Sequence, residues 1–440
     1  MKDGIIINNN YIIRGNNMES KNIVKLILTS VGVLVVAACN NINQPSSSSS
    51  SGFVLSSSSV SSEPSSSSSS SSSVPDNHAL RFELSEDGTY YSVFSLNAVE
   101  TRDRVIIPST YNGKPVTTIG KRAFQYCNYM TQVVVPDSIT TICDYAFSYS
   151  HVESFTFSEN IKTVGDYAFE STRLTTVTIP YTITNFGSYV FESCFSLRSV
   201  TIAEGFESTG HATFMYCKNL TEINLPNSVK TIGNRSFAGS GFVDLVVPNT
   251  IKTIEMNAFL GTESLKSVVI PNSVKTIGDT AFGGCRYLET VSIANSVTEI
   301  GPCAFSSCFN LKTITLSNEI KTIGSYFFHE CDIMESIVIP NKVETIGWRA
   351  FEMCRKLETV IMPTSVKNID VVAFNQCFVL NIYYLGTAID WNKITMTRTE
   401  SETEDSDWLD KVYCFSEATP TDEGRYWHYV DGVPTKWSNK

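Results

Sequence analysis

The sequence predicts a β-rich repeat solenoid, because three features recur at a nearly constant interval. A phenylalanine returns every 22 or 23 residues, a short apolar alternation precedes it, and an apolar pair followed by glycine lies between the two. A fixed repeat of this length indicates one supersecondary unit that must stack on copies of itself to bury its apolar side. We therefore expect about twelve coils, a parallel β-sheet and few or no long helices. The repeated phenylalanines are Phe124, Phe147, Phe169, Phe191, Phe214, Phe237, Phe259, Phe282, Phe305, Phe328, Phe351 and Phe374.

The 440-residue chain has a globular composition with an acidic balance. Hydrophobic residues make up 42% and charged residues 18%, which is enough apolar material for a sizeable core. The 33 Lys and Arg residues are outnumbered by 44 Asp and Glu, so the formal net charge is -11. Nucleic-acid binding requires clustered cations that displace counterions. This composition therefore argues against a nucleic-acid partner.

Residues 1–38 are predicted to be a leader that contains a lipoprotein signal peptide. Residues 26–38 are apolar, follow two lysines, and are too few to span a bilayer comfortably, as in the central part of an export signal. Residues 36–39 resemble the lipobox of bacterial lipoproteins, in which cleavage occurs just before the cysteine. We therefore expect lipid on Cys39, with a plain signal peptide and an incidental cysteine as the alternative. The segment before Met18 lacks the features of a signal start, so translation is expected to begin at Met18.

Residues 39–78 are predicted to be a disordered tether. They contain Asn and Gln followed by almost unbroken serine. Such a segment cannot bury enough apolar surface to offset its chain entropy. As a flexible coil it would have a reach of about 35 Å. The order of lipid, tether and repeats indicates display away from a membrane.

Each repeat is predicted to contain a short strand, a turn and a buried phenylalanine. Residues 288–311 show the whole unit, and Leu288, Val291 and Ile293 have the leucine-rich repeat spacing. The alternating end is expected to form a strand that pairs in parallel with its copies. Proline often follows and ends the strand because it has no N–H to donate. The later glycine is expected to permit a tight corner or a positive φ.

The unit L-x-x-(V/I)-x-(I/L)-P-x-x-(V/I)-x-x-I-G-x-x-A-F-x-x-C resembles the leucine-rich repeat of BspA-like bacterial surface proteins. The resemblance covers about residues 104–385, and we expect the solenoid itself to span residues 109–385. Two repeats are one residue short, at residues 150–152 and 240–242. We expect a small irregularity of the coil at both places.

Both ends of the solenoid are predicted to be capped, since a terminal coil would otherwise expose apolar surface and unpaired backbone. Residues 79–108 are typical of an N-terminal β cap, with a hairpin turn at Asp87-Gly88. Residues 386–440 are predicted to be a C-terminal cap, closed by a short helical piece and followed by an aromatic tail.

Aromatic residues near the C-terminus form the candidate binding patch of the sequence. An exposed aromatic cluster can bind a partner. The alternative is that these side chains pack on the last repeat. The candidate residues are Tyr384, Tyr426, Trp427 and Tyr429.

Most cysteines occupy one position of the repeat, three residues after the phenylalanine. Ser or Thr takes this place in the other four repeats, which indicates a buried ladder of small side chains that contact backbone groups of an adjacent turn. Disulfides and a metal site are the alternatives. Zinc prefers four converging ligands and not a column of single thiols, so we expect no metal. No role is predicted for Cys143, Cys303 and Cys414. The structural-ladder cysteines are Cys127, Cys194, Cys217, Cys285, Cys308, Cys331, Cys354 and Cys377.

No catalytic residues and no cofactor are predicted. The five histidines lie in the tether, in separate repeats and in the tail, and nothing places two of them beside a nucleophile. Neither a P-loop nor a dinucleotide-binding glycine motif is present. We therefore expect that the protein is not an enzyme.

The outward face of the strands is the predicted displayed surface. Side chains that flank the central apolar residue of each strand point outward, and they are mostly Ser, Thr and Val. High β propensity alone explains this composition, and a broad adhesive surface is the functional interpretation. Aromatic side chains, which stack on sugars, are nearly absent from these positions before Tyr384.

The resemblance implies a non-catalytic protein on the extracellular face of a bacterial cell membrane, attached through lipid on Cys39. Its solenoid would mediate adhesion to, or recognition of, an extracellular host or neighbouring-cell protein. Matrix proteins and glycans are the candidate ligands. The alternative is a structural or variable surface-coat protein without a dedicated ligand.

Overall fold

The computed structural model describes residues 6–7, 11–12, 80–98, 103–398, 407–421 and 423–437. Met18, Cys39 and the serine-rich tether lie outside these described residues. Near the start of the chain, β1 (Ile6–Ile7) and β2 (Tyr11–Ile12) pair antiparallel. Within the described ranges, no helix has the length and apolar character needed to cross a membrane.

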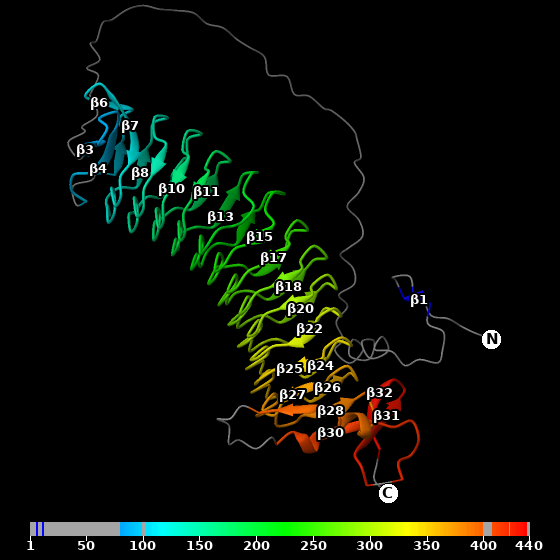
Figure 1. The fold of residues 1–440 in the computed structure, drawn as a ribbon. Coiled ribbons are helices and arrows are strands. Elements are labelled where there is room, and N and C mark those ends of the chain that lie inside the picture. Colours follow the sequence, from blue (N-terminus) through cyan, green and yellow to red (C-terminus); the bar gives the residue numbers. More distant parts are fainter. Residues whose placement is uncertain are drawn as a thin grey trace, which may run out of the picture.

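The repeats form a solenoid of about 13 turns with almost no helix, which confirms the predicted fold class. Figure 1 shows the coils stacked in sequence order, from the cyan N-terminal coils to the orange C-terminal coils. Most coils contribute two short strands, and these strands pair in parallel with their counterparts in neighbouring coils. The sequence predicts the first strand of each coil, whereas the second takes the place of an expected simple corner.

The first strand of each coil carries the predicted apolar alternation. In β20, Val291 and Ile293 are buried whereas Thr290 and Ser292 are exposed. One side of this ladder therefore faces the core and the other faces solvent. The first strands are β5 (Arg104–Ile106), β8 (Gln132–Val134), β11 (Thr176–Ile179), β13 (Ser199–Ile202), β14 (Glu222–Asn224), β16 (Asp244–Val246), β18 (Ser267–Ile270), β20 (Thr290–Ile293), β22 (Thr313–Thr315), β24 (Ser336–Val338), β26 (Thr359–Met362), β28 (Asn381–Tyr384) and β30 (Val412–Phe415).

The second strand of each coil is mostly a two-residue pair that ends in a buried aliphatic residue. In β19 the buried residue is Ile277, and Thr276 beside it is half-buried. The second strands are β7 (Lys114–Ile119), β9 (Thr141–Ile142), β10 (Thr163–Val164), β12 (Asn185–Phe186), β15 (Thr231–Ile232), β17 (Thr253–Ile254), β19 (Thr276–Ile277), β21 (Glu299–Ile300), β23 (Thr322–Ile323), β25 (Thr345–Ile346), β27 (Asn368–Asp370) and β29 (Thr395–Thr397).

The repeated phenylalanines form a continuous stack through the core. All twelve are buried. Successive ring centroids lie between 4.8 Å, for Phe351 and Phe374, and 6.1 Å, for Phe305 and Phe328. Offset aromatic stacking at such distances is favourable beyond the area that it buries. The stack therefore couples every coil to its two neighbours.

The third side of each coil is the segment that follows the second strand, and it carries the repeated phenylalanine within a series of tight turns. The residues two before and two after the phenylalanine adopt positive φ in nearly every coil, as Thr280 (54°) and Gly284 (68°) do around Phe282. Their N–H groups donate to the next coil, to the carbonyl oxygens of Pro302 at 2.9 Å and Ser306 at 2.7 Å. The main chain of this side is thus hydrogen-bonded between coils.

The repeated glycine allows close approach between coils, and the expectation of a positive φ at this position is met at Gly210, at 80°, but not at the other repeat glycines. At Gly278 and Gly301 φ lies outside the left-handed region. A Cβ on Gly278 would lie 2.6 Å from the carbonyl carbon of Glu255, and one on Gly301 would lie 2.5 Å from the backbone nitrogen of Asp279. Neighbouring coils therefore touch the Cα of Gly278 and Gly301, and at these two coils only glycine leaves room for that contact.

The two ladders are interrupted, but at different interfaces between coils. First-strand pairing stops between β8 and β11, where only an isolated bridge from Gln132 to Ser154 remains, and also between β14 and β16 and between β22 and β24. The first two of these places coincide with the two short repeats, as the sequence predicts. Second-strand pairing stops between β12 and β15, where a bridge from Ser208 to Thr231 remains, and between β21 and β23.

A hairpin covers the N-terminal end of the second-strand ladder. It consists of β3 (Leu80–Leu84) and β4 (Tyr91–Ser95), and β4 pairs in parallel with β7. The turn contains Gly88 at a φ of 69° and Asp87, whose carboxylate accepts from the backbone N–H of Thr89 at 3.0 Å. Hydrogen bonds from Ser85 and Thr89 lower the pKa of Asp87. The short β6 (Thr110–Tyr111) pairs antiparallel with β7.

The C-terminal end is closed by a helical turn and a second hairpin. The single turn α2 (Ala388–Trp391) has a capping box between Thr387 and Asp390. After η2 (Leu409–Lys411), β30 joins the first-strand ladder, and the hairpin of β31 (Tyr426–Val430) and β32 (Val433–Lys436) extends it. Trp408 is buried, donates to the carbonyl oxygen of Val371 at 2.7 Å and packs on Phe374.

Candidate functional site on the solenoid surface

The outward row of the first-strand ladder is a hydroxyl-rich surface with few charges. Register pairs join Thr176 with Ser199 and Thr178 with Thr201. Further along the ladder, Val246 pairs with Val269 and both side chains are exposed. The row gives an accessible uncharged surface, but it contains no convergent group of polar side chains that would define one ligand.

The eight ladder cysteines lie in one buried column beside the phenylalanine stack. Each side chain is inaccessible to solvent, and the thiols from Cys194 onward donate to the carbonyl oxygen of a repeat phenylalanine in the preceding coil. Cys308 does so to Phe282 at 3.3 Å and Cys354 to Phe328 at 3.1 Å. Thr262 makes the equivalent bond to Phe237 at 3.2 Å. Every cysteine within the described residues is free.

Burial also determines the chemistry of the column. Loss of solvent raises the pKa of Cys194 to about 11 and of Cys285 to about 12. The nucleophile and metal ligand is the thiolate, so these neutral thiols act as hydrogen-bond donors.

Three cysteines of the described residues lie outside the column. Cys143 takes the usual glycine position, Cys303 lies two residues before a phenylalanine, and Cys414 is buried in β30.

The thiol column should make the solenoid sensitive to alkaline pH. The pKa of Cys285 is about 12 in the folded chain against an ordinary value of 9.0. Stability from the retained proton is therefore complete below pH 9 and is lost as the pH rises towards 12. The unfolding free energy of the parent should fall as the pH rises through this window. In Cys285→Ser we expect that fall to be smaller by about 1.4 kcal/mol per pH unit. Urea denaturation at about pH 8 and about pH 11 measures the difference, and parallel pH profiles would contradict it.

The C-terminal candidate patch is largely internal, which corrects its interpretation as a binding surface. Tyr384 is 1% exposed and Trp427 is 0% exposed, whereas Tyr426 and Tyr429 are half-buried. Trp427 donates from Nε1 to the carbonyl oxygen of Tyr384 at 2.9 Å and packs edge-on against Tyr383. Burial raises the pKa of Tyr429 to about 12.

The physical reason for this correction is strand register. Tyr384 pairs with Met362 and faces the core, and Tyr383 pairs with Ile361 and faces outward. A shift of one residue moves a side chain to the other face of a strand. Trp427 then covers Ile361 and Tyr383, so the tail buries the outward row of the last coils.

Two columns of aromatic side chains, which the sequence interpretation did not identify, lie on the third side of the N-terminal coils. Two residues before the phenylalanine, Tyr145, Tyr167 and Tyr189 stack at centroid distances of 4.9 Å and 4.6 Å. Two residues after it, Tyr126 and Tyr149 stack at 5.3 Å. The sequence does contain a signal for these columns, because their tyrosines recur every 22 or 23 residues. These positions lie outside the predicted strands, where the displayed surface was expected.

A groove of about 470 Å³ lies beside the second of these columns. The rings at its ends are accessible, with exposures of 55% for Tyr126, 44% for Tyr149 and 52% for Phe195. A hydrogen bond to the Glu170 carboxylate raises the pKa of Tyr149. Asn128, His151, Ser171, Thr172, Arg173 and Ser196 complete the lining of the groove.

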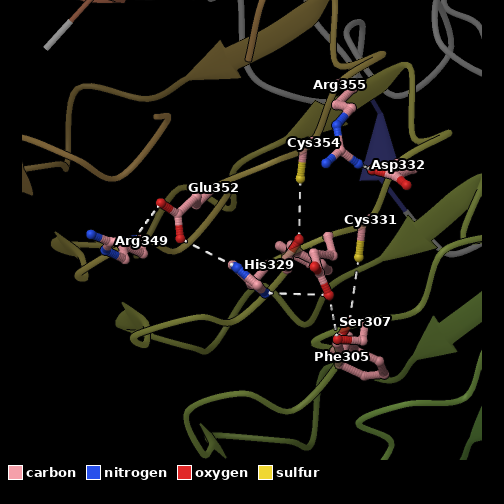
Figure 2. A network of polar contacts seen from close by, with 11 residues as sticks. Phe305, Ser307, His329, Cys331, Asp332, Arg349, Glu352, Cys354 and Arg355 are labelled. Carbon is pink, nitrogen blue, oxygen red and sulfur yellow. Dashed lines mark hydrogen bonds and ion pairs between the residues drawn. The ribbon is translucent and has the colours of Figure 1, made fainter. Parts of the chain in front are cut away.

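A polar network crosses the third side in the C-terminal half of the solenoid (Figure 2). Glu352 is 1% exposed, and its carboxylate lies 2.6 Å from the Arg349 guanidinium and 3.3 Å from His329 Nε2. Ser307 donates to Glu330 at 2.9 Å, and Glu330 lies 3.8 Å from His329 Nδ1. A buried carboxylate requires such partners, so the contacts with Arg349 and His329 offset part of the cost of burying Glu352.

No metal site is found in the part of the chain that the structure describes, since no three His, Cys, Asp or Glu side chains are arranged to hold an ion. The surface cations frequently pair with carboxylates of adjacent coils. Examples are Lys312 with Glu289 at 2.6 Å and Lys367 with Glu344 at 2.8 Å. Because these surface charges are paired, the two candidate binding features of the solenoid surface are the uncharged outward row of the first strands and the aromatic groove.

Two solved structures of bacterial leucine-rich repeat proteins resemble the chain. A leucine rich cell surface protein from Faecalibacterium prausnitzii A2-165 is 28% identical, and the alignment covers 72% of this chain and 96% of that one at a TM-score of 0.48. A leucine-rich repeat protein from Bacteroides ovatus ATCC 8483 is 21% identical, with coverages of 73% and 98% and a TM-score of 0.54. The second comparison shows a shared solenoid fold.

A family model gives the assignment. No curated protein is significantly similar to the chain. The model of the BspA type leucine rich repeat region matches residues 117–244 and 252–381, which together exceed half of the chain. With its stacked coils, phenylalanine core and parallel ladders, the chain belongs to the BspA-type leucine-rich repeat family.

Proposed function

We propose that this protein is a non-catalytic, lipid-anchored protein of the bacterial cell surface whose solenoid binds a macromolecule outside the cell. The observation that carries the proposal is the group of large exposed side chains on the N-terminal coils. Tyr126, Tyr149 and Phe195 are exposed and line one groove, and Tyr129 and Tyr216 are further exposed rings of the N-terminal half. Single exposed apolar residues are ordinary, whereas a gathered set is typical of an interaction surface.

The ligand in this proposal is a protein or glycan of a host or of a neighbouring cell. Adhesion suits a long solenoid, because neighbouring coils can contribute to one extended contact area. The BspA-type repeats support a binding role, and the uncharged strand row would tolerate close approach of a neutral surface. Lipid on Cys39 and the tether of residues 39–78 would present the solenoid outside the membrane.

The test expresses the full chain and its Cys39→Ala variant in a bacterium that lacks the protein. We expect the parent chain to incorporate labelled fatty acid and remain with the membrane, and the variant to incorporate none and be released. Cells that display the parent chain should attach saturably to surfaces coated with extracellular-matrix proteins or to host cells. Antibody staining of intact cells confirms display in each case.

The outcomes separate the parts of the proposal. Absence of fatty acid from the parent chain would overturn the lipid anchor. Absence of attachment by cells that stain fully for the protein would overturn adhesion and favour a surface coat without a dedicated ligand.

A further inference from the structure

We propose that the groove between Tyr126, Tyr149, Arg173 and Phe195 binds an acidic oligosaccharide. This inference rests on the proposed function, because it gives the surface-binding solenoid a specific ligand class. The groove lies on the third side of the coils and not on the strand row. Its ligand would be an extended chain of sugar rings with a carboxylate near the middle.

The two tyrosines of the groove have backbone N–H groups that are already hydrogen-bonded, so they offer no free donor to a peptide main chain. The N–H of Tyr126 donates to Ser148 O at 3.0 Å, and the N–H of Tyr149 donates to Glu170 O at 2.8 Å. An added peptide strand needs free backbone donors and acceptors at a sheet edge. A ligand that contacts these two tyrosines must therefore be recognised by their side chains.

The side chains of the groove have the composition that sugars require. A pyranose ring has an apolar C–H face, which packs on an aromatic ring, and hydroxyl groups at its edge, which exchange hydrogen bonds with short polar side chains. The groove offers exposed rings at Tyr126, Tyr149 and Phe195. Between them lie hydroxyl groups and the Asn128 amide. No Asp or Glu lines the groove, and the Glu170 carboxylate beside it accepts a hydrogen bond from Tyr149.

Arg173 provides the evidence for an acidic ligand. Arginines at the same repeat position, four residues after the phenylalanine, pair with a carboxylate of the preceding coil elsewhere in the solenoid. Arg355 lies 2.6 Å from Asp332, and Arg286 lies 3.5 Å from Glu263. The corresponding residue before Arg173 is His151, and Arg173 has no ion-pair partner within the described residues. A ligand carboxylate would occupy the place that Asp332 fills for Arg355.

The spacing of the rings fits a chain of sugars. Tyr126 and Phe195 belong to coils that are three steps apart, and a ladder step is about 4.8 Å, so the groove extends over about 14 Å. The Tyr126 and Tyr149 rings are inclined by only 23° and stack on each other. Backbone hydrogen bonds between coils hold the residues that carry them in place. A groove with preformed geometry loses little entropy when it binds.

The test measures binding of a hexasaccharide of alternating glucuronic acid and N-acetylglucosamine to the full chain in mild detergent, by isothermal titration calorimetry. A second probe is the same hexasaccharide with its carboxylates reduced to alcohols. We expect Tyr149→Ala and Phe195→Ala each to raise the Kd about tenfold or more, equivalent to about 1.4 kcal/mol. Arg173→Gln should lower the affinity for the acidic hexasaccharide to the affinity that the parent has for the reduced hexasaccharide. The matched controls are Phe378→Ala and Arg286→Gln, at the same repeat positions outside the groove, and they should bind as the parent does.

Three results would overturn the inference: no binding of the acidic probe, equal binding of both probes by the parent, or parental affinity in the groove variants. Circular dichroism of each variant verifies that these exposed substitutions leave the fold intact. The cell-attachment assay is scored separately. If cells attach but the hexasaccharide does not bind, the inference fails and the proposed function stands. If the hexasaccharide binds but cells do not attach, adhesion fails and the groove stands.

Discussion

Replacing Phe282 with alanine is expected to lower the free energy of unfolding by about 3 to 5 kcal/mol, the usual range for truncating a fully buried aromatic side chain. The Phe282 ring is inaccessible to solvent and packs between Phe259 and Phe305 at centroid distances of 5.3 Å and 5.6 Å. Strand pairing on both sides fixes the spacing of these coils, so the cavity cannot collapse. Guanidinium denaturation followed by circular dichroism measures the loss.

The control for this prediction is Phe378→Ala, which removes an exposed phenylalanine and should change the free energy of unfolding by no more than about 0.5 kcal/mol. Since each coil contacts only its neighbours, the damage from Phe282→Ala should also be local. Hydrogen exchange should accelerate most in β18 to β22 and least in the caps. A uniform acceleration along the chain would contradict this nearest-neighbour description.

Gly278→Ala is expected to destabilise the solenoid by about 2 to 3 kcal/mol, as overpacking of a rigid site does. The added methyl group would lie 2.6 Å from the carbonyl carbon of Glu255, and this neighbour is main chain that belongs to the adjacent coil. The strain can be relieved only by separating the two coils. A lower melting temperature and a lower denaturation midpoint should both report it.

Gly261→Ala is the matched control for the glycine prediction. Gly261 has a φ of 64°, but a Cβ there would have no atom within 4 Å. Tyr149 and Ser307 occupy the equivalent place in other coils with φ values of 56° and 57°. We expect a cost of about 1 kcal/mol from the left-handed backbone alone. If Gly261→Ala were as costly as Gly278→Ala, crowding between coils would not explain the repeated glycine.

The fold was predictable because its main determinants are periodic and local. The phenylalanine interval defines the coil length, and the alternation in residues such as Val291 and Ile293 defines the first strand. The second-strand ladder was not predictable, since a pair such as Thr276 and Ile277 is too short to show a period of two. Its stability comes from pairing with other coils, which no local pattern contains.

The candidate site was harder to predict, because surface roles depend on which face a side chain occupies. Tyr384 was assigned to the outward row, and its pairing with Met362 places it in the core. The rings of Tyr126 and Phe195 are separated in sequence and occupy different repeat positions. Only the stacking of four coils brings them to one groove.

The staggered interruptions of the two ladders have a mechanical consequence. Where first-strand pairing stops, as between β14 and β16, the second strands β15 and β17 remain paired across the same interface. Where second-strand pairing stops, as between β21 and β23, the first strands β20 and β22 remain paired. The interruptions of the two ladders alternate along the solenoid, so at no interface between coils are both ladders broken. A pulling force along the axis would meet hydrogen-bonded strands at every repeat-to-repeat joint.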